Sequence, residues 1–118
     1  MQCRPPLAVY QFTVLAAVAL GLAPIPVNAQ EAVTLQISIK NHRFSPSELK
    51  APANRPVTLA VRNLDPTPEE FESRTLRVEK VIAGNSEITI QLRPLSPGRY
   101  RFYGDFNQGT AQGALIAE

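Results

Sequence analysis

Apolar residues alternate with polar residues along several short runs of this chain, and this period of two constrains the fold most strongly. The alternation is clearest at residues 33–40, 57–61, 88–92 and 99–103. Successive side chains of an extended strand point to opposite faces, so each run presents one apolar face and one polar face. No run has a convincing helical period. The chain is therefore predicted to be all-β.

Turn-forming residues separate these runs every eight to twelve residues or so, the spacing typical of a sandwich. Turns are expected at residues 41–46, 52–56, 83–85 and 94–98, and a loop at residues 63–68. Residues 48–51 and 113–117 are short enough to be minor strands, and residues 71–82 are expected to be extended but irregular. The predicted fold is a Greek-key antiparallel β-sandwich of about seven strands.

The first 29 residues have the pattern of a secretory signal peptide. Arg4 supplies a positive start, residues 7–22 are mostly apolar, and Val27-Asn28-Ala29 matches a small-residue cleavage site. A retained membrane anchor is the alternative, but the apolar run is shorter than the roughly 20 residues that a membrane span needs. We therefore expect cleavage after Ala29, one domain at residues 30–118, a periplasmic location and no stable membrane insertion.

Composition limits the chemistry of residues 30–118. The only cysteine is Cys3 and the only methionine is Met1, so this part of the chain has neither sulfur type, and its single histidine is His42. The net charge of the whole chain is +2, and Arg4 is lost with the signal. A charge so near neutrality, with no aromatic residues interleaved in a basic stripe, argues against nucleic acid as a partner.

The segment from Tyr100 to Gly113 resembles the copper-binding loop of cupredoxins without its ligands. An aromatic run ends the penultimate strand and a glycine opens the last one, as in that family. A second resemblance, to the loop of the first copper ligand, covers residues 63–70. The four positions of the type 1 copper ligands are then occupied by Glu69, Gly104, Asn107 and Ala111. Type 1 copper requires imidazoles, a thiolate and a weak axial ligand, so no type 1 copper is expected.

A narrower resemblance covers nearly all of the predicted domain. The matching segments are residues 43–46, 51–54, 68–73, 77–81, 97–100 and 104–107. The order of Glu70-Phe71-Glu72-Ser73 and Asp105-Phe106 makes this combination resemble EfeO-type cupredoxin-like domains, especially small periplasmic proteins of Ftr-type iron-uptake systems. Many members of that group have a histidine at the position of Asn107, and this chain departs from them there.

Six residues are candidate metal ligands. In the resembled fold the loop after the third strand meets the loop before the last strand, and His42 follows the first strand. Carboxylate and amide oxygens suit ferrous iron, manganese or calcium, and copper(II) when an imidazole joins them. Solvated carboxylates and an unliganded turn histidine are the alternative reading. The candidates are Glu69, Glu70, Glu72, Asp105, Asn107 and His42.

The resemblance implies a role in metal acquisition. The protein is expected to bind or present iron or copper to a membrane iron permease or a periplasmic metal-binding protein, and to assist ferrous-iron oxidation at most as an accessory. No catalytic residues are predicted, because the chain lacks a nucleophile and base in a plausible arrangement. The alternative is a metal-free β-sandwich that serves as an interaction module in a periplasmic or membrane complex.

Overall fold

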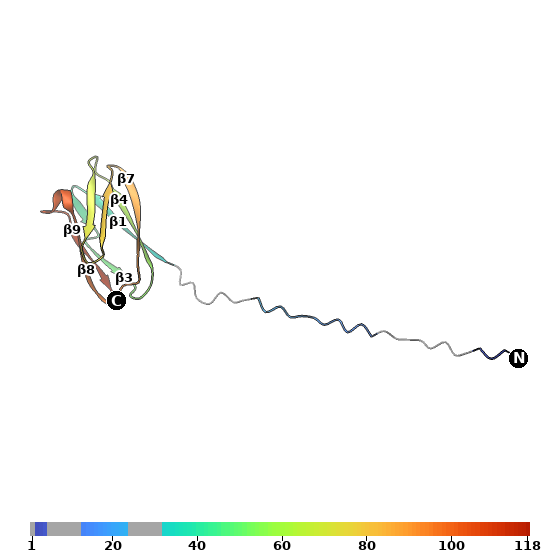
Figure 1. Ribbon diagram of the computed structural model, residues 1–118. Helices are drawn as coiled ribbons and strands as arrows, with labels where there is room; N and C mark the ends of the chain where they lie inside the picture. The colour runs from blue at the N-terminus through green and yellow to red at the C-terminus, as the bar shows by residue number, and fades with distance from the viewer. Residues whose placement is uncertain (1, 5–12, 24–31) are drawn as a thin grey trace.

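The computed structural model describes residues 2–4, 13–23 and 32–118, and the last of these ranges forms a two-layered β-sandwich (Figure 1). The expected all-β fold is confirmed. Within residues 32–118, a single 3-10 turn, η1 (Asp105–Asn107), interrupts the strands. The strands are β1 (Val33–Lys40), β2 (Arg43–Ser45), β3 (Glu48–Ala51), β4 (Val57–Asn63), β5 (Glu69–Ser73), β6 (Val78–Ile82), β7 (Ser86–Leu92), β8 (Gly98–Gly104) and β9 (Gln112–Ala117).

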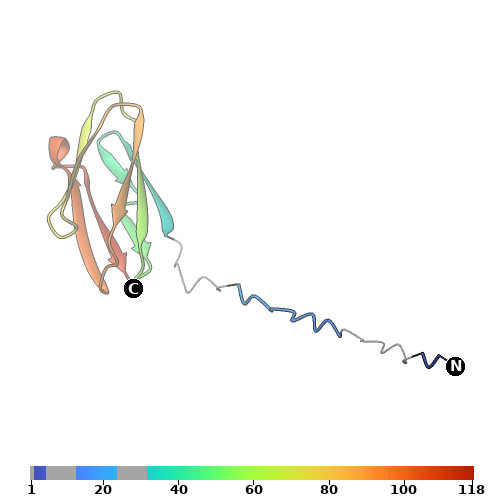
Figure 2. The same ribbon diagram turned by 45° about the vertical axis from the view of Figure 1, so that its right-hand side comes forward.

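The two sheets are the layers of the sandwich, and the turned view separates them (Figure 2). The four-stranded sheet has the order β2-β1-β4-β7, and the five-stranded sheet has the order β3-β9-β8-β5-β6. Two neighbouring pairs, β1 with β4 and β3 with β9, are parallel. Alternation predicts which face of a strand is buried but carries no strand direction, so the sequence did not indicate these parallel pairs.

The described residues form nine strands rather than about seven, because two predicted irregular segments contain strands. Residues 41–46, expected to be a turn, include β2, which closes a hairpin with β1. Asn41 and His42 both have positive φ, as a two-residue hairpin turn requires. Residues 71–82 divide into β5 and β6 around a turn, with Arg77 at positive φ.

Three phenylalanines from both sheets meet at the centre of the core. The ring centroids of Phe71 and Phe102 are 5.0 Å apart in a stacked arrangement, and Phe44 meets both rings edge-on. All three are at most 5% exposed. Since aromatic rings bury large apolar areas, this group holds β2, β5 and β8 against one another. Phe102 lies on the face that the alternation predicted to be buried.

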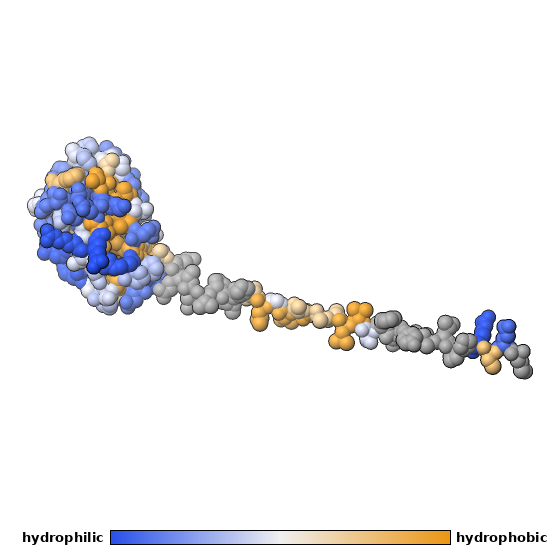
Figure 3. Space-filling view, in the orientation of Figure 1, coloured by the Kyte–Doolittle hydropathy of each residue, from blue (hydrophilic) through white to orange (hydrophobic). Residues whose placement is uncertain are grey.

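The predicted cleavage site after Ala29 lies outside the described residues. Residues 13–23, part of the predicted signal, form neither helix nor strand, and their apolar side chains are exposed (Figure 3). Among the described residues, no helix has the length and apolar character needed to cross a membrane.

Candidate functional site

The carboxylate of Glu69 lies buried between two loops at one end of the sandwich. Glu69 begins β5 and is 1% exposed. Its Oε1 accepts hydrogen bonds from the backbone N–H groups of Glu70, at 3.0 Å, and Phe106, at 2.9 Å. Its Oε2 accepts a hydrogen bond of 2.6 Å from the side-chain amide of Asn107. Both carboxylate oxygens are thus satisfied from within the protein, as a buried polar group requires.

Gly104 leaves the space that this carboxylate fills. A Cβ built on Gly104 would lie 2.6 Å from Cδ of Glu69 and 2.7 Å from Cβ of Ala111. Both distances are shorter than a non-bonded carbon contact, so any side chain at position 104 would displace its neighbours. The four residues at the expected ligand positions therefore lie together, and Glu69 occupies the space between them.

Short backbone hydrogen bonds shape the loop that carries Asn107. The N–H of Gly104 donates to the carbonyl of Ala111 at 2.8 Å, and the N–H of Ala111 donates to the carbonyl of Asn107, also at 2.8 Å. The loop from η1 to β9 is consequently a closed turn, which holds the Asn107 amide against Glu69.

These residues do not fit a type 1 copper ion. Glu69, Gly104, Asn107 and Ala111 supply one carboxylate and one amide, whereas such a centre uses imidazole nitrogens and a thiolate sulfur. The carboxylate and the amide are also bonded to each other at 2.6 Å.

A second group of carboxylates lies on the outer face of the same sheet. One oxygen each from Glu70, Glu72 and Glu79 can lie within 4.8 Å of the others, and we call these three residues the acidic triad. Glu72 is paired directly with Glu79 in the register of β5 and β6. Like charges directly opposite each other on neighbouring strands are destabilising unless something neutralises them.

The surroundings of Glu70 disfavour the charged form of its carboxyl group. Its pKa is raised above the ordinary 4.5, first because the sheet surface removes water from the carboxyl group, and then because it shares a hydrogen bond and a repulsive field with Glu79. The charges of Asp105 and Glu72 act in the same direction. A cation at this place would relieve the repulsion.

His42 is engaged elsewhere at the same end of the sandwich. The Asp65 carboxylate accepts hydrogen bonds from the backbone N–H groups of Asn41, at 2.8 Å, and His42, at 2.9 Å. Nδ1 of His42 lies 3.6 Å from Oδ2 of Asp65. These bonds lower the pKa of Asp65, with the His42 N–H the largest cause. Asp65 thus fixes the hairpin turn, and His42 is its neighbour.

The structure divides the six candidate ligands into three places. It brings Glu69 and Asn107 together as a buried pair, and it places Glu70 and Glu72 on the outer face with Asp105 near them. Within residues 32–118, no hydrogen bond or ion pair joins His42 to the other five. Whether any of the six binds a metal remains a prediction.

Sequence reasoning missed Glu79 as a partner of Glu70 and Glu72. The hairpin register places Glu79 opposite Glu72, and Arg77 lies in the turn before β6. Pairing residues 69–73 with residues 78–82 as a hairpin would have revealed the triad.

Comparison with known families and sequences gives a consistent assignment. A family model described as a cupredoxin-like domain matches residues 11–117. An uncharacterized protein of Rickettsia prowazekii (strain Madrid E) is 44% identical over 82 residues, which are 70% of this chain and 66% of that relative. The chain therefore matches slightly less than two thirds of that relative's length.

Solved structures share the fold at low identity. Auracyanin A, a blue copper protein from Chloroflexus aurantiacus, superposes with a TM-score of 0.64 at 14% identity, covering 75% of this chain and 100% of its own. The metal-binding domain of the Streptococcus pneumoniae D39 Cu(I)-exporting P-type ATPase has a TM-score of 0.61 at 16% identity, covering 72% of this chain and 84% of its own. Superposition at such low sequence identity establishes the fold alone. It confirms the cupredoxin-like fold expected from the loop at residues 100–113.

Proposed function

Because this chain belongs to the family of cupredoxin-like domains, we propose that it is a periplasmic protein that handles iron or copper for a membrane uptake system. The observation that carries this proposal is the acidic triad, whose three carboxylates converge within 4.8 Å beside the loop that holds copper in blue copper proteins. The metal would contact the outer face of the sheet, because the Glu69 position is filled by its own hydrogen bonds.

The chemistry of the triad selects the kind of metal. Glu70, Glu72 and Glu79 offer only oxygen, and oxygen ligands suit ferrous iron, manganese or other hard and borderline cations better than copper(I). The charge of Asp105 also raises the pKa of Glu70, so Asp105 is a fourth carboxylate close to the triad. An open, partly exposed site of this kind favours transient binding and release, as delivery to another protein requires.

The partner we propose is a membrane iron permease or a periplasmic metal-binding protein. The resemblance to EfeO-type domains of iron-uptake systems supports that choice, as does the signal-like pattern of residues 1–29. In this role the protein would receive the ion, hold it outside the cytoplasm and pass it on. An accessory part in ferrous-iron oxidation belongs to the same proposal.

Calorimetric titration tests the metal site. The purified protein is titrated with Fe(II) under anaerobic conditions, with Mn(II) and with Cu(II). We expect saturable binding of at least one metal, and its loss when Glu70, Glu72 and Glu79 are all replaced by glutamine. Glu87→Gln is the matched control, since Glu87 is an exposed carboxylate on β7 in the other sheet. Absence of binding by the unaltered protein, or equal binding by the triple variant, contradicts the proposal.

A metal-free interaction module is the second candidate function, and one observation favours it. The Glu69–Asn107 hydrogen bond closes the position at which the related proteins hold copper, so the loops there are stable without an ion. Crosslinking in cells followed by mass spectrometry distinguishes the two functions. A partner captured equally by the protein and by the triad triple variant supports the module, whereas capture that requires the triad and added metal supports metal handling.

A further inference from the structure

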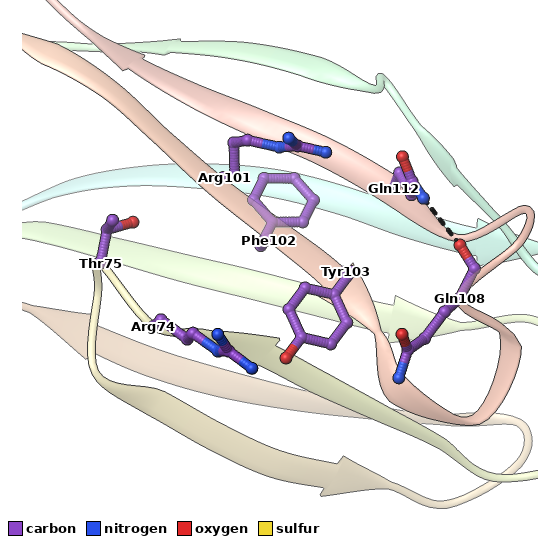
Figure 4. Close-up of a pocket in the computed structure, with 7 residues that line it drawn as sticks. All are labelled: Arg74, Thr75, Arg101, Phe102, Tyr103, Gln108 and Gln112. Atoms are coloured by element: carbon purple, nitrogen blue, oxygen red, sulfur yellow. Dashed lines mark hydrogen bonds between the residues drawn. The ribbon is translucent and has the colours of Figure 1, made fainter.

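A pocket of about 420 Å³ opens on the outer face of the five-stranded sheet, apart from the Glu69 site. It lies where β5 leaves β8, and the side chains of the turn after β5 and of the loop before β9 complete its walls (Figure 4). We call it the basic cleft. Its lining includes Arg74, Arg101, Tyr103, Gln108 and Gln112.

The register of β5 and β8 explains why the cleft exists. Glu72 is paired with Tyr103, so continued pairing would place Arg74 directly opposite Arg101. The pairing of the two strands ends at Glu72 and Tyr103, before that position is reached. The Ser73 hydroxyl instead donates a 2.6 Å hydrogen bond to the carbonyl of Arg101 and accepts one from the N–H of Leu76. Ser73 thereby fixes the turn against β8 and leaves the two guanidinium groups facing a shared space.

The lining of the cleft is rich in hydrogen-bond donors. The Arg74 guanidinium lies beside the Tyr103 hydroxyl, whereas the Arg101 side chain extends towards Gln112, and Gln108 lies on the far side of Tyr103 (Figure 4). The Gln112 amide donates one N–H to the carbonyl of Gln108 at 2.9 Å, which leaves its second N–H for a ligand. A guanidinium group carries five N–H donors and no acceptor, so this lining matches an acceptor-rich ligand.

No ion pair within residues 32–118 includes Arg74 or Arg101. The ion pairs found there join His42 to Asp65, Lys50 to Glu118 and Arg99 to Glu48. Two negative groups contact the lining. Glu72 shares a hydrogen bond with the Tyr103 hydroxyl, and Asp105 accepts one of 2.7 Å from Gln108. An anion in the cleft would lie away from these two carboxylates.

Tyr103 stays protonated in this environment. Its pKa is raised, first because the cleft removes water from the phenol and then because of the hydrogen bond and charge of Glu72, while Arg74 acts in the opposite direction. At neutral pH the hydroxyl group is therefore uncharged and does not repel an anion.

We propose that the basic cleft binds a small anion that carries two or more oxyanion groups, either carboxylates or phosphates. One oxyanion group faces each guanidinium, since arginine binds carboxylate and phosphate through two parallel N–H donors. The volume of about 420 Å³ exceeds what a single carboxylate fills. This inference rests on the arginine cleft and does not require metal binding, although Glu72 and Asp105 border both sites.

NMR titration of the purified protein at constant ionic strength tests the proposal. Citrate and pyrophosphate are the two polyvalent probes, and acetate is the monovalent comparison. We expect saturable shifts of the Arg101, Tyr103 and Gln112 amides with at least one polyvalent probe. Tighter binding of citrate assigns the site to polycarboxylates, and tighter binding of pyrophosphate assigns it to phosphate esters or polyphosphates.

Charge-matched variants separate a built site from a general charge effect. Arg74→Gln and Arg101→Gln should each weaken binding about tenfold, the loss expected for one charged hydrogen bond. Arg62→Gln removes an exposed arginine from β4 in the other sheet and should leave binding unchanged. Amide spectra of each variant report whether it is folded. Equal weakening by Arg62→Gln, acetate binding as strong as citrate binding, or unsaturable shifts would each overturn the proposal.

Discussion

The Glu69 carboxylate accepts a 2.6 Å hydrogen bond from the Asn107 side-chain amide, and this bond joins two loops that are 38 residues apart in the sequence. The sequence resemblance places both residues in segments that are similar to the copper-binding loops of cupredoxins. In this structure the bond links the loop before β5 to the loop before β9. An interaction within the protein stabilises this end of the sandwich without requiring an ion.

Asn107→Ala should lower the free energy of unfolding by about 1 to 3 kcal/mol, since it leaves the buried Oε2 of Glu69 without a donor. Urea denaturation followed by circular dichroism measures the change. Gln108→Ala is the control, because it alters the next residue of the same loop, which is exposed and bonds the half-buried Asp105. An Asn107 variant as stable as the control would show that the buried bond contributes little.

Gly104→Ala should destabilise the fold by about 1 to 3 kcal/mol through overpacking, because the added methyl group would lie 2.6 Å from Cδ of Glu69. The double variant with Glu69→Ala removes the clashing group. We therefore expect the double variant to be more stable than the sum of the two single effects predicts. Strict additivity in a double-mutant cycle would mean that the methyl group is accommodated in some other way.

Asp65→Asn should destabilise the β1–β2 hairpin by about 1 to 2 kcal/mol, because a neutral amide cannot accept both backbone hydrogen bonds as a carboxylate does. The pKa of Asp65 in the folded protein lies below its ordinary 3.8. The stabilisation from ionised Asp65 is thus present above pH 3.8 and is lost as the pH falls through the folded pKa.

Thermal melts of the unaltered protein and of Asp65→Asn between pH 3 and pH 7 test this dependence. The difference in Tm between the unaltered protein and Asp65→Asn should be largest near pH 7 and should become smaller towards pH 3. A gap that is constant with pH would indicate that the charge of Asp65 is not responsible.

Glu70→Gln should raise the Tm at neutral pH, because it removes one of three repelling carboxylates in the acidic triad. The pKa of Glu70 is raised in the folded state, so ionisation costs stability as the pH rises from 4.5 through the folded pKa. The advantage of the variant should therefore disappear below about pH 4.5. Glu87→Gln, on the other sheet, should show no such pH-dependent gain.

Much of the fold could be predicted from local sequence patterns. Alternation identified the buried faces of β1, β4, β7 and β8, since a strand exposes every second side chain to the core. It failed at β2, which has only three residues and so cannot display a period. It also failed to divide β5 from β6, because charged residues occur both in these strands and in the turn between them, so composition does not mark the turn.

The candidate site could be predicted only in part. The resemblance to the copper-binding loops of cupredoxins correctly predicted that Glu69, Gly104, Asn107 and Ala111 lie close together. The same reasoning grouped Glu69 with Glu70 and Glu72, although neighbouring residues of a strand face opposite sides of a sheet. Glu69 consequently points inward to a buried bond, while Glu70 and Glu72 point outward to Glu79.

The sequence by itself determined that this chain is an all-β sandwich with carboxylate and amide side chains, and no sulfur, in the segments that resemble the copper-binding loops of cupredoxins. Strand periodicity and residue identity are local properties. Only the tertiary structure decided which of those groups meet. Strand register placed Glu79 opposite Glu72 and ended the pairing of β5 and β8 before Arg74 could meet Arg101. The packing of two loops on Gly104 turned Glu69 into a buried hydrogen-bond acceptor. Such contacts depend on residues distant in the chain, and a period of two does not encode them.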